Sequence, residues 1–216
     1  MVDTEWPNSW RAAFRIELRA EAIGLAWRGW PVVPGTYPDA DTTVGTPYTE
    51  TLWTRPAPAH SDWQSRIGAH PQQVAAWWTG RPYSVLVATG TLVDAIEVDD
   101  HLGRRAAMLL RGTGRPAPIV AMPNGRWLFL VASADHLPRE LDEAETVEWH
   151  GEGSWIPLPP TPFHHGVVHW RVKPDVWGWN LPPAPVVHDV LVRALNDVSA
   201  PRTDVPQVVP VESSAA

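Results

Sequence analysis

Acidic residues with a strand-like spacing are the first feature of this sequence that could carry chemistry. Glu97 and Asp99 alternate with the apolar residues Ile96 and Val98 in the segment DAIEVD. Side chains two residues apart in a β-strand point to the same face, so we expect Glu97 and Asp99 to project together. Paired carboxylates at a strand end suit a hard divalent cation such as Mg²⁺, which takes oxygen ligands. The same spacing fits a second interpretation, in which Asp99 or Asp100 caps the following helix.

Further along the chain lie a third acidic residue and an Arg–Trp pair. Glu148 lies in the segment TVEWH, which we expect to be a strand, and it joins the first two carboxylates only if the strands are neighbours. Arg126 and Trp127 follow the dipeptide Asn124-Gly125. The guanidinium of Arg126 matches phosphate oxygens, and the ring of Trp127 offers a face on which a base can stack. A tight turn followed by a packed Trp explains the same residues without any ligand.

Four histidines are a weaker candidate for a metal site. His164, His165 and His169 cluster after Pro159-Pro160, with His150 upstream, and imidazoles at such spacings can bind zinc. They lie in a loop and an alternating strand, without a second pair of ligands. We therefore do not predict a zinc site here.

Composition limits the classes of protein to which the chain can belong. Of its 216 residues 44% are hydrophobic and 19% charged, which predicts a folded core. The absence of Cys excludes disulfide scaffolds and thiol nucleophiles. A net charge of −7 argues against a simple DNA-coating protein, although residues 101–134 contain five Arg and no acid. That basic stripe is either a contact for nucleic acid or a solvated helix face. No apolar run is long enough to span a membrane and no secretory signal is visible, so we expect a cytoplasmic location.

Hydrophobic periodicity predicts an α+β fold, with a mixed sheet flanked by helices. We expect a single domain over residues 1–198, a flexible tail over 199–216 and a long loop over 35–61. Asn-Gly predicts one hairpin, and the Gly-Glu-Gly turn at 151–153 predicts another, between the strands 146–149 and 154–158. The predicted helices are 9–28, 71–80, 101–111 and 185–195, and the remaining strands are 30–33, 83–88, 94–99, 119–122, 126–131 and 167–172.

The order of several motifs resembles the N-terminal domain of bifunctional DNA primase/polymerases, the Prim-Pol branch of the archaeo-eukaryotic primase superfamily. The resemblance covers about residues 15 to 175 and implies an RRM-like sheet with a two-metal nucleotidyl-transfer site. The motifs that carry it are Gly29 to Pro34, Trp77-Trp78, the strand ending at Asp99, the segment Asn124 to Phe129, Glu148 to Trp155, Pro159-Pro160-Thr161 and His165-Gly166.

The resemblance also implies a role for each candidate site residue. The Asp-x-Asp of the family appears as Glu97-Val98-Asp99 and its later Asp as Glu148, so these three acids would be catalytic and would hold Mg²⁺ or Mn²⁺. Arg126 and Trp127 would bind the nucleotide, with Trp127 in place of a nucleotide-contacting His. The Lys that the family often has in the loop after its first strand has no counterpart.

Two functions are the main candidates, given these differences from the family pattern. The first is a primase/polymerase-like nucleotidyltransferase that acts on a single-stranded DNA template with nucleoside triphosphates, attenuated by the change from His to Trp, with a helicase as a possible separate partner. The alternative is a catalytically inactive Prim-Pol-like protein that binds nucleic acid or a nucleotide. A structural domain whose 14 Trp form an interaction surface is the third and weakest idea. We expect no association with a membrane in any of these.

Overall fold

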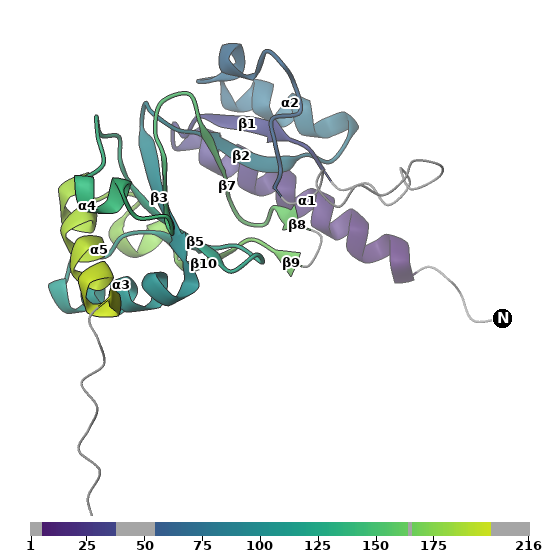
Figure 1. Ribbon diagram of the computed structural model, residues 1–216. Coiled ribbons are helices and arrows are strands. Elements are labelled where there is room, and N and C mark those ends of the chain that lie inside the picture. Colours follow the sequence, from purple (N-terminus) through teal and green to yellow (C-terminus); the bar gives the residue numbers. More distant parts are fainter. Residues whose placement is uncertain (1–5, 38–54, 164–165, 200–216) are drawn as a thin grey trace, which may run out of the picture.

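The computed structural model describes residues 6–37, 55–163 and 166–199, which form two lobes (Figure 1). The elements in chain order are α1 (Trp6–Trp27), β1 (Val32–Gly35), the 3-10 helix η3 (Trp63–Arg66), α2 (Pro71–Gly80), β2 (Ser84–Ala88), β3 (Val93–Asp99), α3 (Asp100–Thr113), β4 (Ile119–Ala121), β5 (Arg126–Ala132), α4 (Arg139–Asp142), β6 (Val147–His150), β7 (Trp155–Pro157), β8 (Pro162–Phe163), β9 (Gly166–Val167), β10 (His169–Val172), the 3-10 helix η4 (Pro174–Trp177) and α5 (Ala184–Ser199). No helix among the described residues combines the length and the apolar character needed to cross a bilayer.

The larger lobe is built on a five-stranded sheet with the order β10-β4-β5-β3-β6. Its chain order β3-α3-β4-β5-α4-β6 is the β-α-β-β-α-β arrangement of RRM-like folds, extended at one edge by β10. Strand β3 lies between β5 and β6, so its side chains have neighbours on both sides. The predicted α+β class is confirmed, but every strand pairing among the described residues is antiparallel, whereas we predicted a mixed sheet.

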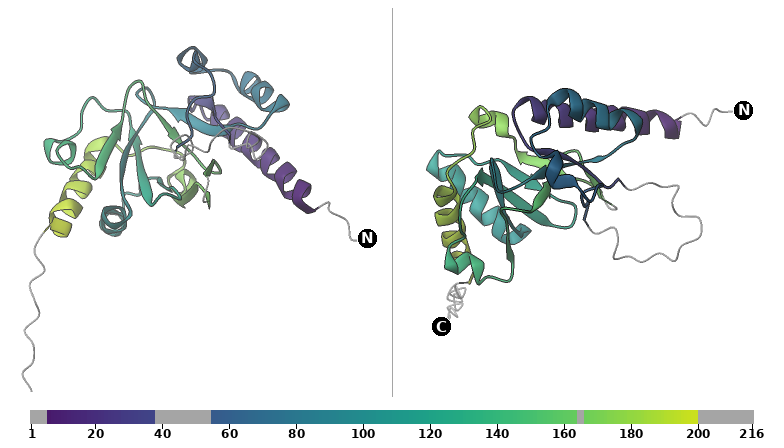
Figure 2. Two further views of the ribbon diagram at one scale, coloured as in Figure 1. Left: turned by 45° about the vertical axis from the view of Figure 1, so that its right-hand side comes forward. Right: turned by 90° about the horizontal axis from the view of Figure 1, so that it is seen from above.

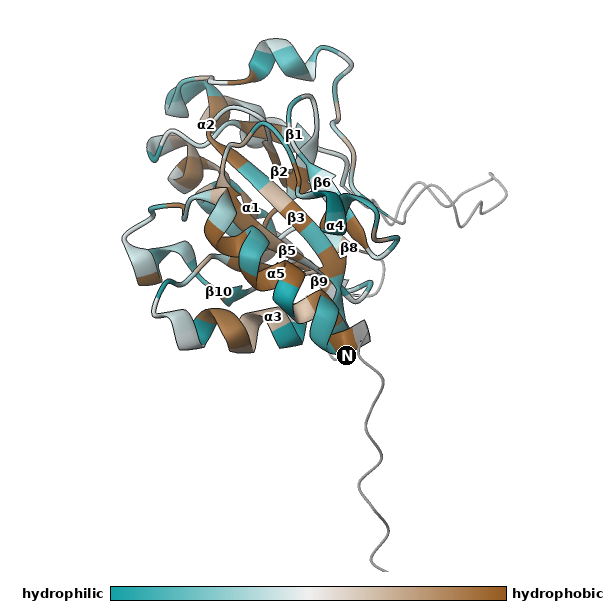
Figure 3. Ribbon diagram, turned by 60° about the vertical axis from the view of Figure 1, so that its left-hand side comes forward, coloured by the Kyte–Doolittle hydropathy of each residue, from teal (hydrophilic) through white to brown (hydrophobic). Residues whose placement is uncertain are grey.

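Helices α3 and α5 cover one face of this sheet. Apolar residues of α3 recur at helical spacing, and they pack with α5 on the alternate residues of β3 and β5 that point to this side. Figure 3 shows apolar positions that alternate with polar ones along β3, and apolar positions on both helices. The residues that form this core include Ile96, Val98, Leu102, Ala106, Leu110, Phe129, Val187 and Leu191.

The opposite face of the five-stranded sheet packs toward the smaller lobe. That lobe consists of a three-stranded sheet, in the order β1-β2-β7, and of the helices α1 and α2 (Figure 2). Ala95, Leu128 and Leu130 point to this side and share one core with Leu18 of α1 and Val87 of β2. The strand residues that share a face with Ala95 therefore lie between the two lobes.

The second predicted hairpin is wrong. Strand β6 pairs with β3 in the larger sheet, whereas β7 pairs with β2 in the smaller sheet. The turn at 151–153 therefore crosses from one sheet to the other, held by the Thr89 hydroxyl, which donates to the carbonyl of Gly151 at 2.5 Å. The strand predicted over 167–172 is divided into β9 and β10.

Other differences concern the ends of elements. Helix α5 continues to Ser199, and the rest of the predicted tail lies outside the described residues, as does the part of the predicted long loop over 38–54. The short helices η3, α4 and η4 were not predicted, because each has only four residues and leaves little periodic signal in the sequence.

The absence of a side chain at Gly90 allows the 151–153 turn to pack closely against the segment that precedes β3. Its φ is +98°, and a Cβ at this residue would lie 2.2 Å from the Cα of Glu152. We expect Gly90→Ala to lower the free energy of unfolding by on the order of 2 kcal/mol, because the backbone is strained and the turn must move. Gly112→Ala in α3 is the control, since nothing lies within 4 Å of its Cβ position. Urea unfolding measures the stability of both variants. A Gly90→Ala variant as stable as Gly112→Ala would show that the turn shifts freely.

Candidate functional site

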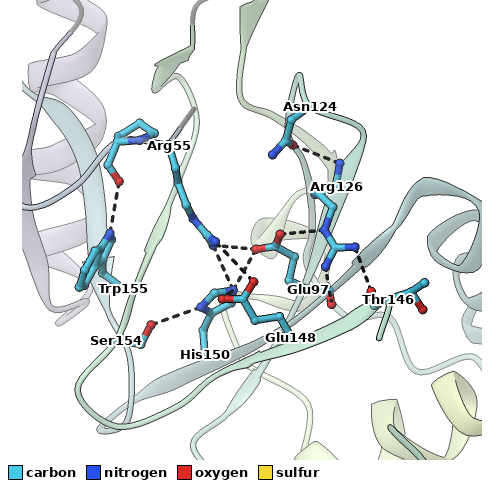
Figure 4. A network of polar contacts seen from close by, with 10 residues as sticks. Arg55, Glu97, Asn124, Arg126, Thr146, Glu148, His150, Ser154 and Trp155 are labelled. Atoms are coloured by element: carbon cyan, nitrogen blue, oxygen red, sulfur yellow. Dashed lines mark hydrogen bonds and ion pairs between the residues drawn. The ribbon is translucent and has the colours of Figure 1, made fainter. Parts of the chain in front are cut away.

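The register of β3 and β6 brings two carboxylates and an imidazole together. Glu97 lies directly opposite Glu148, and Ala95 lies directly opposite His150. Directly opposed residues share a face, so Glu97, Glu148 and His150 all point to the side between the lobes (Figure 4). One possible ligand atom from each of the three lies within 4.8 Å of the others. The strands that carry Glu97 and Glu148 are therefore neighbours, which is the condition under which we expected Glu148 to join Glu97.

Glu97 is the buried centre of this group, with a side chain only 4% exposed, whereas that of Glu148 is 55% exposed. Its Oε1 accepts from Arg126 Nε at 2.8 Å. Its Oε2 lies 2.6 Å from Arg55 Nη2 and 2.9 Å from His150 Nε2. Burial by itself would raise the pKa of Glu97. The hydrogen bonds of His150 and Arg126 and the charge of Arg55 outweigh burial and lower the pKa to about 2.

Arg126 is the more firmly held of the two arginines. Besides Glu97 Oε1, it donates from Nη1 to the carbonyl of Thr146 at 2.9 Å, just before β6. Its backbone N–H donates to Asn124 Oδ1 in the hairpin turn, at 3.2 Å. Arg126 thus joins β5, β3 and the start of β6 at the site, and its guanidinium lies on the carboxylate face.

His150 is oriented by Ser154, whose Oγ lies 3.2 Å from His150 Nδ1. The tautomer with its proton on Nδ1 donates to Ser154 and turns the Nε2 lone pair toward the two carboxylates. The other tautomer donates from Nε2 to Glu97 Oε2. Neutral imidazole and carboxylate groups are both common metal ligands. A group composed of Glu97, Glu148 and His150 could therefore bind a metal ion.

Asp99 does not join this group, although we predicted it as a metal ligand. Its Oδ1 accepts from the backbone N–H groups of His101 and Leu102, at 2.8 and 2.9 Å. Asp99 is thus the N-cap of α3, which is the second interpretation that its spacing allowed. The first turn of the helix draws its carboxylate away from Glu97 and Glu148.

Trp127 does not face the carboxylates either. Adjacent residues of a strand point to opposite faces, so Trp127 lies on the helix-covered side while Arg126 lies at the site. It is 6% exposed, and a Cβ at Gly103 of α3 would lie 2.9 Å from its ring. The guanidinium of Arg171 covers the ring at 4.6 Å from its centroid. The surface expected for base stacking is therefore already covered, and Arg126 is the residue of the pair that shares the site.

Of the basic stripe, Arg126 lies at the site, whereas the arginines on α3 are remote from the carboxylates. Helix α3 packs on the opposite face of the sheet. Arg104 pairs with Asp100 on the same helix, and Arg105 pairs with Asp197 of α5 at 2.6 Å. Of the histidines, the exposed His169 lies on β10, at the other edge of the sheet from β6, while residues 164–165 lie outside the described part of the chain.

Sequence reasoning missed Arg55 altogether and gave His150 no place beside the acids. Arg55 was included in the predicted loop, although it is the only Lys or Arg between Arg28 and Arg66. A single basic residue in a long stretch whose other charged residues are all acidic is a weak signal, but it could have identified Arg55 as a candidate. The period-two spacing of Glu148 and His150 was a stronger signal, because it places both side chains on one face.

Comparison with known proteins gives a match to one family model. No curated protein matches the chain. The family model described as the N-terminal domain of bifunctional DNA primase/polymerase, Prim-Pol, matches residues 22–187, which is more than half of the chain and includes β3, β5 and β6. The order of motifs, the RRM-like sheet and this match agree, and the chain belongs to the Prim-Pol family of DNA primase/polymerase N-terminal domains.

Proposed function

We propose that this chain is a metal-dependent nucleotidyltransferase of the primase/polymerase type, acting on single-stranded DNA with nucleoside triphosphates. The observation that carries the proposal is the cross-strand pair of Glu97 and Glu148 with His150 beside it, in a chain of the Prim-Pol family. A separate helicase would supply the single-stranded template.

The residues of the site have distinct roles in this proposal. Glu97, Glu148 and His150 would hold Mg²⁺ or Mn²⁺, which would supply positive charge to stabilise the transferred phosphoryl group. Arg126 keeps the carboxylate of Glu97 oriented, and its guanidinium, which is partly exposed, would contact the triphosphate. Asp99 supports the site indirectly, by fixing the start of α3 at the end of β3.

One observation favours the alternative, an inactive Prim-Pol-like protein that binds a nucleotide or nucleic acid. Both carboxylate oxygens of Glu97 already have cationic or imidazole partners. Under this alternative the group is a structural ion-pair network, and binding of the nucleic acid or nucleotide needs no divalent ion. The two functions therefore differ in their dependence on metal.

Extension of a primed single-stranded template with Mn²⁺ or Mg²⁺ distinguishes them. We expect incorporation that stops with EDTA and falls at least tenfold in Glu148→Gln, because the variant loses the charge of one proposed metal ligand. The side chain of Glu148 is exposed, so this change should not disturb the core. Glu143→Gln is the control, since Glu143 is exposed and pairs with Arg139 on α4. Absence of incorporation with either metal, together with nucleotide binding unchanged by EDTA, would establish the alternative.

A further inference from the structure

The three candidate metal ligands already surround a cation that belongs to the chain. Arg55 Nη2 lies 2.6 Å from Glu97 Oε2 and 3.0 Å from His150 Nε2, and its Nη1 lies 3.7 Å from Glu148 Oε2. The guanidinium therefore contacts every member of the group, as Figure 4 shows. Carboxylate oxygens and an imidazole nitrogen converge on this position in the way they would on a metal ion.

We propose that Arg55 is a tethered competitor of the divalent ion, which enters the Glu97–Glu148–His150 group only when the guanidinium leaves. This inference rests on the proposed function. A guanidinium and a divalent ion a few ångströms apart repel each other, and the burial of Glu97 limits the screening of this repulsion by water. The competition is also permanent, because Arg stays protonated at any pH at which proteins fold and so cannot make room by losing its charge.

The two arginines are not equivalent in this respect. Arg126 holds Glu97 Oε1 from the β5 side and is also bonded to the carbonyl of Thr146. Arg55 approaches Oε2, the oxygen that also contacts His150 Nε2. Displacing Arg55 therefore removes one of the two partners of Oε2 and leaves that oxygen beside His150, while Arg126 keeps the carboxylate in place.

The backbone that follows Arg55 is held by hydrogen bonds, so the side chain of Arg55 can move without unfolding that segment. The N–H of Thr36 donates to the carbonyl of Ala57 at 2.7 Å, and the N–H of Ala59 donates to Pro34 at 2.9 Å. Trp155 Nε1 donates to the carbonyl of Pro56 at 3.3 Å. The side chain of Arg55 is itself 30% exposed. Rotation of a partly exposed side chain about a fixed backbone is the motion that metal entry requires.

If Arg55 competes with the metal ion, its removal should change metal affinity in the opposite direction from the removal of a residue that supports the site. Removing a charge that helps the site should weaken metal binding, whereas removing a competitor should strengthen it. We expect Arg55→Gln and Arg55→Met each to bind Mn²⁺ at least tenfold more tightly than the wild-type chain. Mn²⁺ is the probe because it accepts both carboxylate and imidazole ligands and is detected directly in its free form by electron paramagnetic resonance.

Binding is measured on the full chain, with Arg66→Gln as the matched control. Arg66 lies in the same stretch of sequence and pairs with Asp62 at 3.2 Å, away from the group. The affinity of the Arg66→Gln variant for Mn²⁺ should therefore equal that of the wild-type chain. Adding Glu148→Gln to Arg55→Gln should abolish the gain. Equal or weaker binding by both Arg55 variants would overturn the inference, and the proposed function would stand if Glu148→Gln still weakens binding. Absence of Mn²⁺ binding in all variants would overturn both.

Discussion

An Arg126→Leu variant is expected to be less stable than the wild-type chain by about 2–3 kcal/mol at neutral pH. The side chain of Glu97 is 4% exposed and would lose the donor to its Oε1, so a buried charge would keep partners on one oxygen only. The carbonyl of Thr146 would lose its donor as well. Arg126 is 24% exposed and Arg55 remains, which is why we expect less than the full cost of breaking a buried pair.

Arg139→Leu provides the matched control for this prediction. Arg139 also pairs with a Glu, at 2.7 Å, but both side chains are mostly exposed, at 84% and 61%. Exposed pairs one helical turn apart contribute about 0.3–0.5 kcal/mol. Urea unfolding of the three proteins at pH 7 gives the comparison. Similar losses in the two variants would mean that the burial of Glu97 does not determine the strength of its ion pair.

Local signals explain which parts of the fold were predictable. Asn124-Gly125 specifies a tight turn between two apolar strands, and β4 and β5 pair around it as predicted. Gly151 to Gly153 carries an equally clear turn signal, yet the flanking strands join different sheets. A turn fixes where the chain reverses or bends, but long-range packing chooses the partner of each strand. That choice has no signature within ten residues of the turn.

The same limit applies to the carboxylates. Residue spacing placed Glu97 and Asp99 on one face, and it is the N-terminus of α3 that draws Asp99 away to cap two N–H groups. Pairing with Glu148 depended on β6 lying next to β3, which no local pattern specifies. The family resemblance supplied that expectation.

Alternation in β5 explains the outcome for the Arg–Trp pair. Two consecutive strand residues cannot face the same site, so Arg126 and Trp127 were mutually exclusive from the start. Only the register with β3, which places Leu128 opposite Glu97, decides that Arg126 is the one on the carboxylate face. Arg55 lies 42 residues from Glu97 in the chain, and a contact of this kind leaves no periodic trace in the sequence.

The stability contributed by Glu97 should disappear in acid. The pKa of Glu97 is about 2 in the folded protein, against an ordinary value of 4.5. Above pH 4.5 the carboxylate is ionised in both states, and its contribution of about 3 kcal/mol is fully present. As the pH falls from 4.5 toward 2, the unfolded chain binds a proton that the folded chain does not, so the folded state loses this advantage.

Glu97→Gln isolates this effect, because its amide keeps the shape of the side chain but does not titrate. Urea unfolding of both proteins between pH 5 and pH 3 should show a difference in free energy that shrinks steadily as the pH falls. Each unit of pH across this range removes up to about 1.4 kcal/mol from the wild-type chain relative to the variant. Parallel curves for the two proteins would contradict a depressed pKa at Glu97, and with it the view that the arginines and His150 hold this carboxylate ionised inside the fold.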